Sequence, residues 1–354
     1  MTETRPSTGT DAIALSEVVT ALRASRGFAH KRDISAVADT LARALPGGLR
    51  DLTLAERDGV LLGDDCAAIP DGDGHLLFAI EGLVEDFVSA MPWFAGYSAV
   101  MVNLSDIAAM GGRPIAVVDA IWSAGAAQAD PILQGMAAAS AAYGVPIVGG
   151  HSNQQAARPQ LAVAVLGRAK ALLSSFAARP GDTLLMAVDL RGQWEGEQPF
   201  WNASSRAPAE RLRADLAVMA EVAEAGLCAS AKDISMAGVL GTALMLAECS
   251  RFGLRLDLSA LPHPPGHGHT DAPAAFLRWV QAFPSYGYLL SVAPAHVAEV
   301  RSRFQARGLA CETIGDVTPG SGVWLQRGTD EQALLWDWQR EPFIGGHAAL
   351  AEAR

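Results

Sequence analysis

Five acidic residues occupy places in the chain where a carboxylate is costly unless it binds something. Two precede CAAI, one interrupts HLLFAIEGLV, one lies within VMVNLSDIAAMGG and one precedes ISMAGVLGTALMLAECS. In chain order they are Asp64, Asp65, Glu81, Asp106 and Asp233. Burial of an unpaired charge is unfavourable, and Mg²⁺ takes oxygen ligands together with the phosphates of a nucleotide. These carboxylates therefore predict a magnesium site that could hold a triphosphate.

Each of these positions also has a purely structural interpretation. An Asp beside a Gly is typical of a turn, and Asp233, in front of a helical pattern, could be a helix cap. Glu81 inside a strand is harder to explain in this way. The glycines of GGHSN (149–153) either allow a ligand to approach the backbone or form a plain turn after a strand. Lys31 is either a point charge that closes over phosphates or a solvated lysine before a helix.

Three histidines form a weaker candidate site. His263, His267 and His269 stand near Asp271 with a spacing that metal sites use. They lie in LPHPPGHGHTDAP, a segment rich in proline and glycine, which is typical of a surface loop. We therefore favour a solvated loop over a metal site here.

The composition excludes several classes of protein. Half of the 354 residues are apolar and 18% are charged, which is typical of a globular chain. The net charge of -11 argues against a nucleic-acid or anionic-membrane surface, because such a field repels phosphate groups. The four cysteines show no CxxC pair, and no apolar run reaches membrane-spanning length. We expect a cytoplasmic protein with reduced thiols.

Apolar periodicity in the first half predicts strands separated by helices. Helices are expected at 12–25, 33–48, 94–112 and 129–144, and strands at 75–84, 114–123, 145–150 and 159–169. Such alternation favours a layered α/β domain that ends near residue 170.

The second half of the chain shows the same alternation of predicted strands and helices. Strands are expected at 179–190, 254–258, 287–293 and 311–317, and helices at 208–225 and 236–251. The polar segment 191–208, with two tryptophans, is expected to be a loop, either a lid or an insertion. We expect three parts: a flexible segment and helix at 1–30, an N-terminal α/β domain at 31–170 and a C-terminal α/β domain at 171–354.

The order of four motifs resembles a known superfamily. The motifs are GDDCAAI, VNLSDIAAMGGRP, VGGHSN and KDISMAGVLGTALMLAECSRFG. In this order they resemble the superfamily of aminoimidazole ribonucleotide (AIR) synthetase, thiamine-monophosphate kinase and selenophosphate synthetase. GGHS at 149–152 and EDFV at 85–88 are most similar to the selenophosphate synthetases.

The resemblance implies a two-domain fold and a nucleotide site. The N-terminal domains would pair across a homodimer to form a β-barrel, with ATP in a groove near that interface. Asp65 and Asp106 would bind Mg²⁺ with Asp64 beside them, Asp233 would reach the same metals, and Glu81 stands where relatives have an Asp. The phosphate or adenosine path would be lined by Asn103, Gly149, Gly150, His151 and Ser152.

The chain departs from the superfamily pattern in two places that bear on its function. Selenophosphate synthetases carry a Cys shortly before the lysine that matches Lys31, and GFAHKRDIS has none. Met236 replaces the Gly or Asp of relatives. We expect Lys31 and Asp65 to be catalytic in an ATP- and Mg-dependent enzyme that phosphorylates or otherwise activates a small molecule. The alternatives are a selenophosphate synthetase or thiamine-monophosphate kinase, and a non-catalytic nucleotide-binding regulator.

Overall fold

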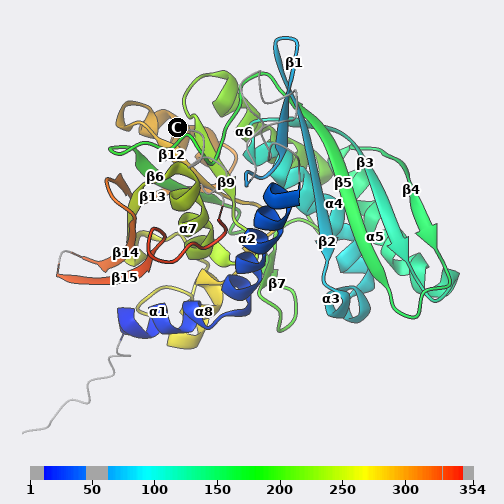
Figure 1. Ribbon diagram of the computed structural model, residues 1–354, viewed down its shortest axis with the longest axis horizontal. Coiled ribbons are helices and arrows are strands. Elements are labelled where there is room, and N and C mark those ends of the chain that lie inside the picture. The colour runs from blue at the N-terminus through cyan, green and yellow to red at the C-terminus, as the bar shows by residue number, and fades with distance from the viewer. Residues whose placement is uncertain (1–11, 45–62, 329, 346–354) are drawn as a thin grey trace, which may run out of the picture.

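The computed structural model describes residues 12–44, 63–328 and 330–345 (Figure 1). Two large β-sheets with helices packed on them divide the described chain into an N-terminal and a C-terminal half, and the C-terminal half also holds a small three-stranded sheet. This layered α/β architecture of two units agrees with the fold class that the sequence predicts. In the described part of the chain, no helix combines the length and the apolar character needed to cross a membrane.

The N-terminal sheet has five strands in the order β1-β2-β5-β3-β4. The strands are β1 (Ala67–Asp71), β2 (Gly74–Leu83), β3 (Arg113–Trp122), β4 (Ile147–Asn153) and β5 (Gln160–Ala169). Neighbouring strands are antiparallel except β3 and β4, which are parallel because a helix, α5 (Ala126–Tyr143), connects them. This helix and α4 (Pro92–Ala109) cover one face of the sheet, and a short helix, α3 (Glu85–Ala90), precedes α4 (Figure 1).

The opposite face of this sheet carries exposed apolar side chains. Phe78 is 50% exposed and Ile80 is 65% exposed. The strand register places Phe78 opposite Leu166, and it places Ile80 in one row with Ala164 and Val118. Side chains in such rows lie next to one another. The three central strands thus share a continuous apolar surface, which we call the outer face.

The C-terminal sheet has seven strands in the order β15-β14-β10-β13-β6-β12-β9. They are β6 (Thr183–Val188), β9 (Ser230–Asp233), β10 (Gly253–Asp257), β12 (Gly287–Val292), β13 (Ala310–Thr318), β14 (Gly322–Arg327) and β15 (Glu331–Asp337). Alternation along β6 sends Leu185 and Ala187 into one hydrophobic cluster and Leu184, Met186 and Val188 into another. The centre of the sheet, at β6, is therefore buried on both faces.

Helices cover both faces of this second sheet. One cluster includes α6 (Ala209–Glu224) and α9 (Val297–Gln305), and the other includes α1 (Leu15–Arg23), α7 (Gly238–Ser250) and α8 (Pro273–Val280). The described part of the chain also contains the short 3-10 helices η2 (Leu258–Ala260) and η3 (Pro294–His296). Asp233 ends the strand β9, whereas α7 begins at Gly238, so the interpretation of Asp233 as a helix cap is wrong.

The polar segment 191–208, expected to be a loop, contains a short hairpin. Strand β7 (Gln193–Trp194) pairs with β8 (Phe200–Asn202), which pairs in turn with β11 (Phe283–Pro284). The ring of Trp201 packs edge-to-face on Trp194 and on Trp279 of α8, with ring centroids 5.4 and 5.6 Å apart. The tryptophans therefore fix the hairpin to the C-terminal half.

Helix α2 (Arg26–Ala44) begins earlier than the helix predicted at 33–48. Phe28, which is 1% exposed, packs between Trp336 and Phe343 with ring centroids 6.3 and 5.1 Å away. These partners lie far along the chain, so local periodicity could not reveal the start of the helix. In Figure 1, α2 runs between the two halves.

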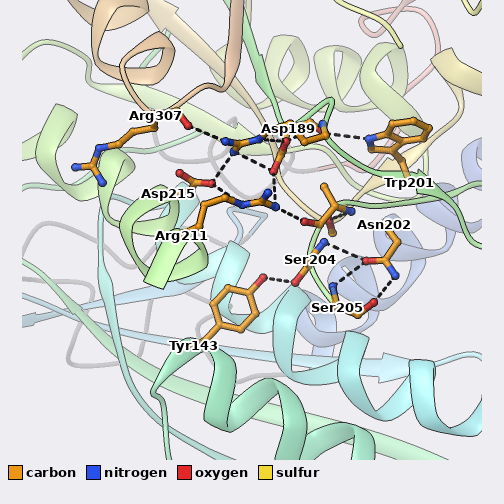
Figure 2. Close-up of polar contacts among 12 residues, drawn as sticks. Tyr143, Asp189, Trp201, Asn202, Ser204, Ser205, Arg211, Asp215 and Arg307 are labelled. Atoms are coloured by element: carbon orange, nitrogen blue, oxygen red, sulfur yellow. Dashed lines mark hydrogen bonds and ion pairs between the residues drawn. The ribbon is translucent and has the colours of Figure 1, made fainter. Parts of the chain in front are cut away.

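A buried polar network joins the two halves (Figure 2). Tyr143 of α5 and Tyr97 of α4 place their hydroxyls 2.7 and 2.8 Å from the hydroxyl of Ser204, which follows β8. In the same network Arg211 of α6 donates to Asp189, 3.3 Å away, which is 2% exposed. Buried hydrogen bonds contribute about 1 kcal/mol each. They hold the segment after the hairpin against the N-terminal helices.

The predicted domain boundaries stay predictions. The boundary after residue 170 falls between β5 and β6, and the boundary after residue 30 falls inside α2.

Candidate functional site

Three of the predicted carboxylates meet where the two halves of the chain touch. Asp65, Asp106 and Asp233 each place one carboxylate oxygen within 4.8 Å of the other two. Asp65 comes from the turn before β1, Asp106 from the C-terminal part of α4 and Asp233 from the end of β9. The contact between α4 and β9 brings Asp106 to Asp233, and Asp65 joins them through its ion pair with Lys232 of β9.

Asp106 is buried without its full set of partners. It is 6% exposed, and its Oδ2 atom has no hydrogen-bond partner among the residues that the structure describes. Burial raises the pKa of Asp106 well above its ordinary value, and the charges of Asp233, Glu81 and Asp65 raise it further. An unpaired buried carboxylate is unfavourable for the protein alone. The arrangement fits a site that a cation completes.

Asp233 shares this environment. Burial, and then the charge of Asp65, raises the pKa of Asp233 to about 7, although Lys232 and Lys31 oppose the shift. The backbone N–H of Asp233 donates to Oδ2 of Asp65 over 3.3 Å. The three clustered side chains offer only oxygen atoms, and this donor set suits Mg²⁺.

Lys232 is a member of the site that sequence reasoning missed. Its ammonium group pairs with Asp65, and both side chains are almost buried. Burial lowers the pKa of Lys232, but the charges of Asp65, Asp233 and Asp64 outweigh this effect, so the pKa lies above its ordinary value. A lysine directly before a predicted ligand was the signal that could have found it, and the structure places both residues in the short buried strand β9.

The cluster lines a cavity of about 1030 Å³ that Glu81 and Lys31 also line. Leu77 and Ala79 of β2 are buried, so alternation places Glu81 on the side of the sheet that α4 covers. Burial raises the pKa of Glu81, and the charge of Lys31 lowers it. Both residues face the cavity that the cluster lines, but Glu81 lies outside the group within 4.8 Å.

Helix α2 holds Lys31 in place through a close backbone contact. A Cβ atom added to Gly27 would overlap the carbonyl oxygen of Met236 and would lie 2.9 Å from the Cα atom of Ala237. Only glycine allows this approach. Lys31 therefore sits on a helix that is docked beside Asp233.

Asp64 is engaged by the chain itself. The hydroxyl groups of Ser174 and Ser175 donate to its carboxylate over 2.6 and 2.7 Å, and the backbone N–H of Ser175 donates over 3.1 Å. Burial raises the pKa of Asp64, as does the charge of Asp65, whereas Lys232 and the two serines lower it. Asp64 thus ties the turn before β1 to the segment after β5. Its predicted role as a metal ligand stays a prediction.

Asn103 is buried in α4, one turn before Asp106. Its Nδ2 atom donates to the carbonyl oxygen of Ala99 over 2.7 Å, and its Oδ1 atom has no partner among the described residues. It does not line the large cavity. Its predicted place on the nucleotide path stays a prediction.

The residues Gly149, Gly150, His151 and Ser152 lie elsewhere in the chain, on the edge strand β4. Gly150, His151 and Ser152 line a smaller hollow of about 280 Å³ together with Asp119. A Cβ atom on Gly150 would overlap the Asp119 carboxylate, so glycine is required at this position. Within one chain, this motif and the carboxylate cluster line different cavities.

The histidine loop forms no metal cluster among the described residues. His267 accepts a hydrogen bond from Trp194 Nε1 over 2.9 Å, and its Nδ1 atom lies 2.9 Å from the carbonyl oxygen of Pro265. The Nδ1 atom of His263 lies 2.9 Å from the carbonyl oxygen of Pro264. These contacts connect the loop to the hairpin. The expected solvated loop is therefore only partly solvated, because His263, His267 and His269 are half-buried.

The family comparisons cover most of the chain. Residues 63–169 match the model described as "AIR synthase related protein, N-terminal domain". Residues 181–326 match the model described as "AIR synthase related protein, C-terminal domain".

Several known proteins resemble the chain over most of its length. It is 44% identical over 332 residues to an uncharacterized protein of Synechocystis, covering 94% of this chain and 98% of the relative. It is 30% identical to a thiamine-monophosphate kinase of Pyrococcus abyssi, covering 78% of this chain and 90% of the relative. A selenide, water dikinase of Citrifermentans bemidjiense is 24% identical over 80% of this chain and 94% of its own.

Solved structures share the fold at low sequence identity. PurL of Thermotoga maritima, complexed with FGAR, matches with a TM-score of 0.68 and 17% identity over 91% of this chain. The present chain spans about half (52%) of that protein. AaThiL, complexed with AMPPCP and TMP, matches with a TM-score of 0.59 and 19% identity, covering 82% of this chain and 96% of its own.

Proposed function

Because the chain belongs to the family of AIR synthase related proteins, we propose that it binds Mg-ATP in the large cavity and uses it to phosphorylate or otherwise activate a small molecule. The observation that carries the proposal is the meeting of Asp65, Asp106 and Asp233 within 4.8 Å. Mg²⁺ bound by these residues would neutralise the phosphates and orient them for transfer.

The charges around the cavity support a requirement for cations. Acidic side chains outnumber basic ones among the described residues that line the cavity. The acidic ones are Asp33, Asp64, Asp65, Glu81, Asp86, Asp106 and Asp233, and the basic ones are Arg26, Lys31 and Lys232. A triphosphate alone would be repelled by this surface. The cavity therefore suits a nucleotide that enters together with its metal ions.

The chain's own residues have distinct proposed roles. Lys232 fixes the orientation of Asp65, which would hold a metal ion on the side of the N-terminal sheet. Asp233 would bind the same metals from the C-terminal half, and Glu81 would reach them from β2. Lys31, on the docked helix α2, would neutralise the phosphoryl group that is transferred. Most of the catalysis would come from positioning and charge neutralisation.

The names of the relatives support ATP-dependent transfer but leave the acceptor open. One relative is named a thiamine-monophosphate kinase and another a selenide, water dikinase. The absence of a Cys from GFAHKRDIS weighs against selenide as the acceptor, and GGHS weighs against thiamine phosphate. The enzyme would be an ATP-dependent phosphotransferase or a ligase or cyclase, in the cytoplasm.

We also propose that the outer face pairs with a second copy of the chain. Phe78, Ile80 and Val118 expose apolar surface there, and surface of this kind is typical of an interface. A homodimer formed through this sheet would bury them. Because β4 is the edge of the same sheet, Gly149–Ser152 would lie near the interface, where a nucleotide path shared by two copies could use them.

Calorimetric titration of Mg-ATP tests the metal site. Asp106→Asn keeps the shape of the side chain and removes a buried charge, so the variant is expected to fold. We expect its affinity for Mg-ATP to fall by at least about tenfold, since even partners of metal ligands contribute that much. Asp130→Asn, on the exposed side of α5, is the matched control and should bind as the wild type does. Equal affinities in the two variants would refute the assignment.

A further inference from the structure

The large cavity is elongated along α4. The residues of this helix that line it include Phe94, Ser98, Met101, Val102 and Asp106. Their spacing places them on one face of the helix. With a rise of 1.5 Å per residue, Phe94 and Asp106 are separated by about 18 Å along the helix axis. The carboxylate cluster therefore occupies one end of this wall, and Phe94 marks the other.

Aromatic rings from both halves of the chain gather at the Phe94 end. The ring of Phe87 (α3) lies 4.8 Å from that of Phe200 (β8) and 6.0 Å from that of Phe94, between ring centroids. Phe283 (β11) lies 6.3 Å from Phe200. All four rings line the cavity, as does Met91. We call this group the aromatic end.

The aromatic end has no positive charge among the described residues that line the cavity. The three basic lining residues come from α2 and β9, whereas the aromatic end is built by α3, α4, β8 and β11. The charged lining residue of α3 is Asp86, an acid. A phosphate or carboxylate placed here would lose its hydration without gaining a counter-charge, which is costly.

We infer that the aromatic end binds the acceptor, and that the acceptor is a planar, largely apolar molecule with no anionic group on the part that lies away from the carboxylates. This inference rests on the proposed function. Ring faces of the phenylalanines and the thioether of Met91 favour aromatic or flat aliphatic groups. The acceptor atom would point along α4 toward Asp106.

The geometry of phosphoryl transfer allows either the acceptor or the adenosine, but not both, to occupy the aromatic end of the cavity. The attacking atom and the leaving nucleotide lie on opposite sides of the transferred phosphorus. Acceptor and adenosine therefore leave the metal cluster in different directions. An adenine edge needs several donors and acceptors. Among the described lining residues next to β8 and β11, the polar side chains are Gln198, in the turn before β8, and Ser285, directly after β11. Ser285 already accepts a hydrogen bond from the backbone N–H of Ala203. These features favour the acceptor.

A matched pair of probes tests the inference on the full chain with Mg²⁺ and AMPPCP present. Tryptophol is neutral, and indole-3-acetate has nearly the same shape with a carboxylate. We expect titration calorimetry to show that tryptophol binds the wild type at least about tenfold more tightly than indole-3-acetate. A tenfold difference corresponds to about 1.4 kcal/mol, which is only part of the cost of desolvating the carboxylate. In Met91→Lys, indole-3-acetate should gain at least about tenfold in affinity from the new counter-charge. Leu334→Lys, an exposed apolar position on β15, is the control and should leave the preference unchanged.

Three results would overturn the inference. The first is that indole-3-acetate binds the wild type as tightly as tryptophol, and the second is that neither probe binds at millimolar concentration. A third would be Phe200→Leu weakening Mg-AMPPCP and leaving tryptophol binding unchanged, which would place adenine at the aromatic end. In each case the proposed function would still hold as long as the wild type binds Mg-ATP. Failure of the wild type to bind Mg-ATP would instead remove the proposed function, whatever the probes do.

Discussion

Lys232 and Asp65 form an ion pair in the interior of the protein, where their side chains are only 7% and 4% exposed. The pair connects β9 of the C-terminal sheet with the turn before β1 of the N-terminal sheet. The same ammonium group also faces Asp233 and Asp64. Lys232 therefore provides much of the charge balance of the site in the metal-free protein.

Replacing Lys232 with Met should destabilise the metal-free protein strongly. The change leaves Asp65 buried without its partner, and the loss of one member of a buried pair typically costs about 3–5 kcal/mol. Added Mg²⁺ should recover part of the loss, because it replaces the missing positive charge. Urea unfolding with and without Mg²⁺ measures both effects. Lys170→Met removes an exposed lysine and is the control; similar losses in both variants would contradict the prediction.

The stability of the metal-free protein should fall as the pH rises from about 4 to about 7. Burial raises the pKa of Asp233 from 3.8 to about 7. In this window the folded protein keeps a proton that the unfolded chain has lost, so raising the pH favours unfolding. Urea midpoints across the window should show the slope. Asp233→Asn should make it smaller, and the raised pKa values of Asp106, Glu81 and Asp64 account for the remainder. An unchanged slope in that variant would mean that another group is responsible.

The affinity for Mg²⁺ should rise over the same pH range. The carboxylates must be deprotonated to bind a metal, so binding releases protons. Titration calorimetry in buffers with different ionisation enthalpies counts the protons released. Proton release close to zero below pH 7 would contradict the raised pKa of Asp233.

Gly27→Ala should lower both activity and stability. In an isolated helix the change would add up to about 1 kcal/mol of stability, because alanine is the better helix former. Here the new Cβ atom would overlap the carbonyl oxygen of Met236, so the start of α2 must move and carry Lys31 with it. Thermal unfolding shows which effect is larger: a higher melting temperature means that helix propensity dominates, and a lower one means that the overlap with Met236 dominates. A stabilised variant with unchanged ATP turnover would show that α2 is not docked in this way.

Ile80→Asp should convert a dimer to a monomer. Ile80 is 65% exposed on the outer face, so the folded chain tolerates a polar side chain there, whereas an apolar interface does not. Light scattering after size exclusion measures the mass of wild type and variant. Leu334→Asp, on β15, is the control, because Leu334 is also an exposed apolar residue but lies away from the outer face. A monomeric wild type would rule out the proposed pairing.

The sequence alone predicted most of the elements and the chemical types at the site. Apolar spacing is a local property, so strands such as β2 and β12 and helices such as α4 and α7 lie close to where periodicity placed them. The carboxylates were visible because a charge within an apolar segment is unusual. Local sequence could not choose between ligand and cap for Asp233, because both need the same residue type.

Only the tertiary structure decided which residues share a site. The contact between α4 and β9 brings Asp106 to Asp233, and the pairing of Lys232 with Asp65 crosses the same junction. The hairpin β7–β8 and the start of α2 escaped prediction because tryptophan packing and the burial of Phe28 stabilise them, and their partners are distant in the chain. Periodicity reports which face of an element is apolar. It cannot report which other element covers that face, since this depends on packing between segments far apart in sequence.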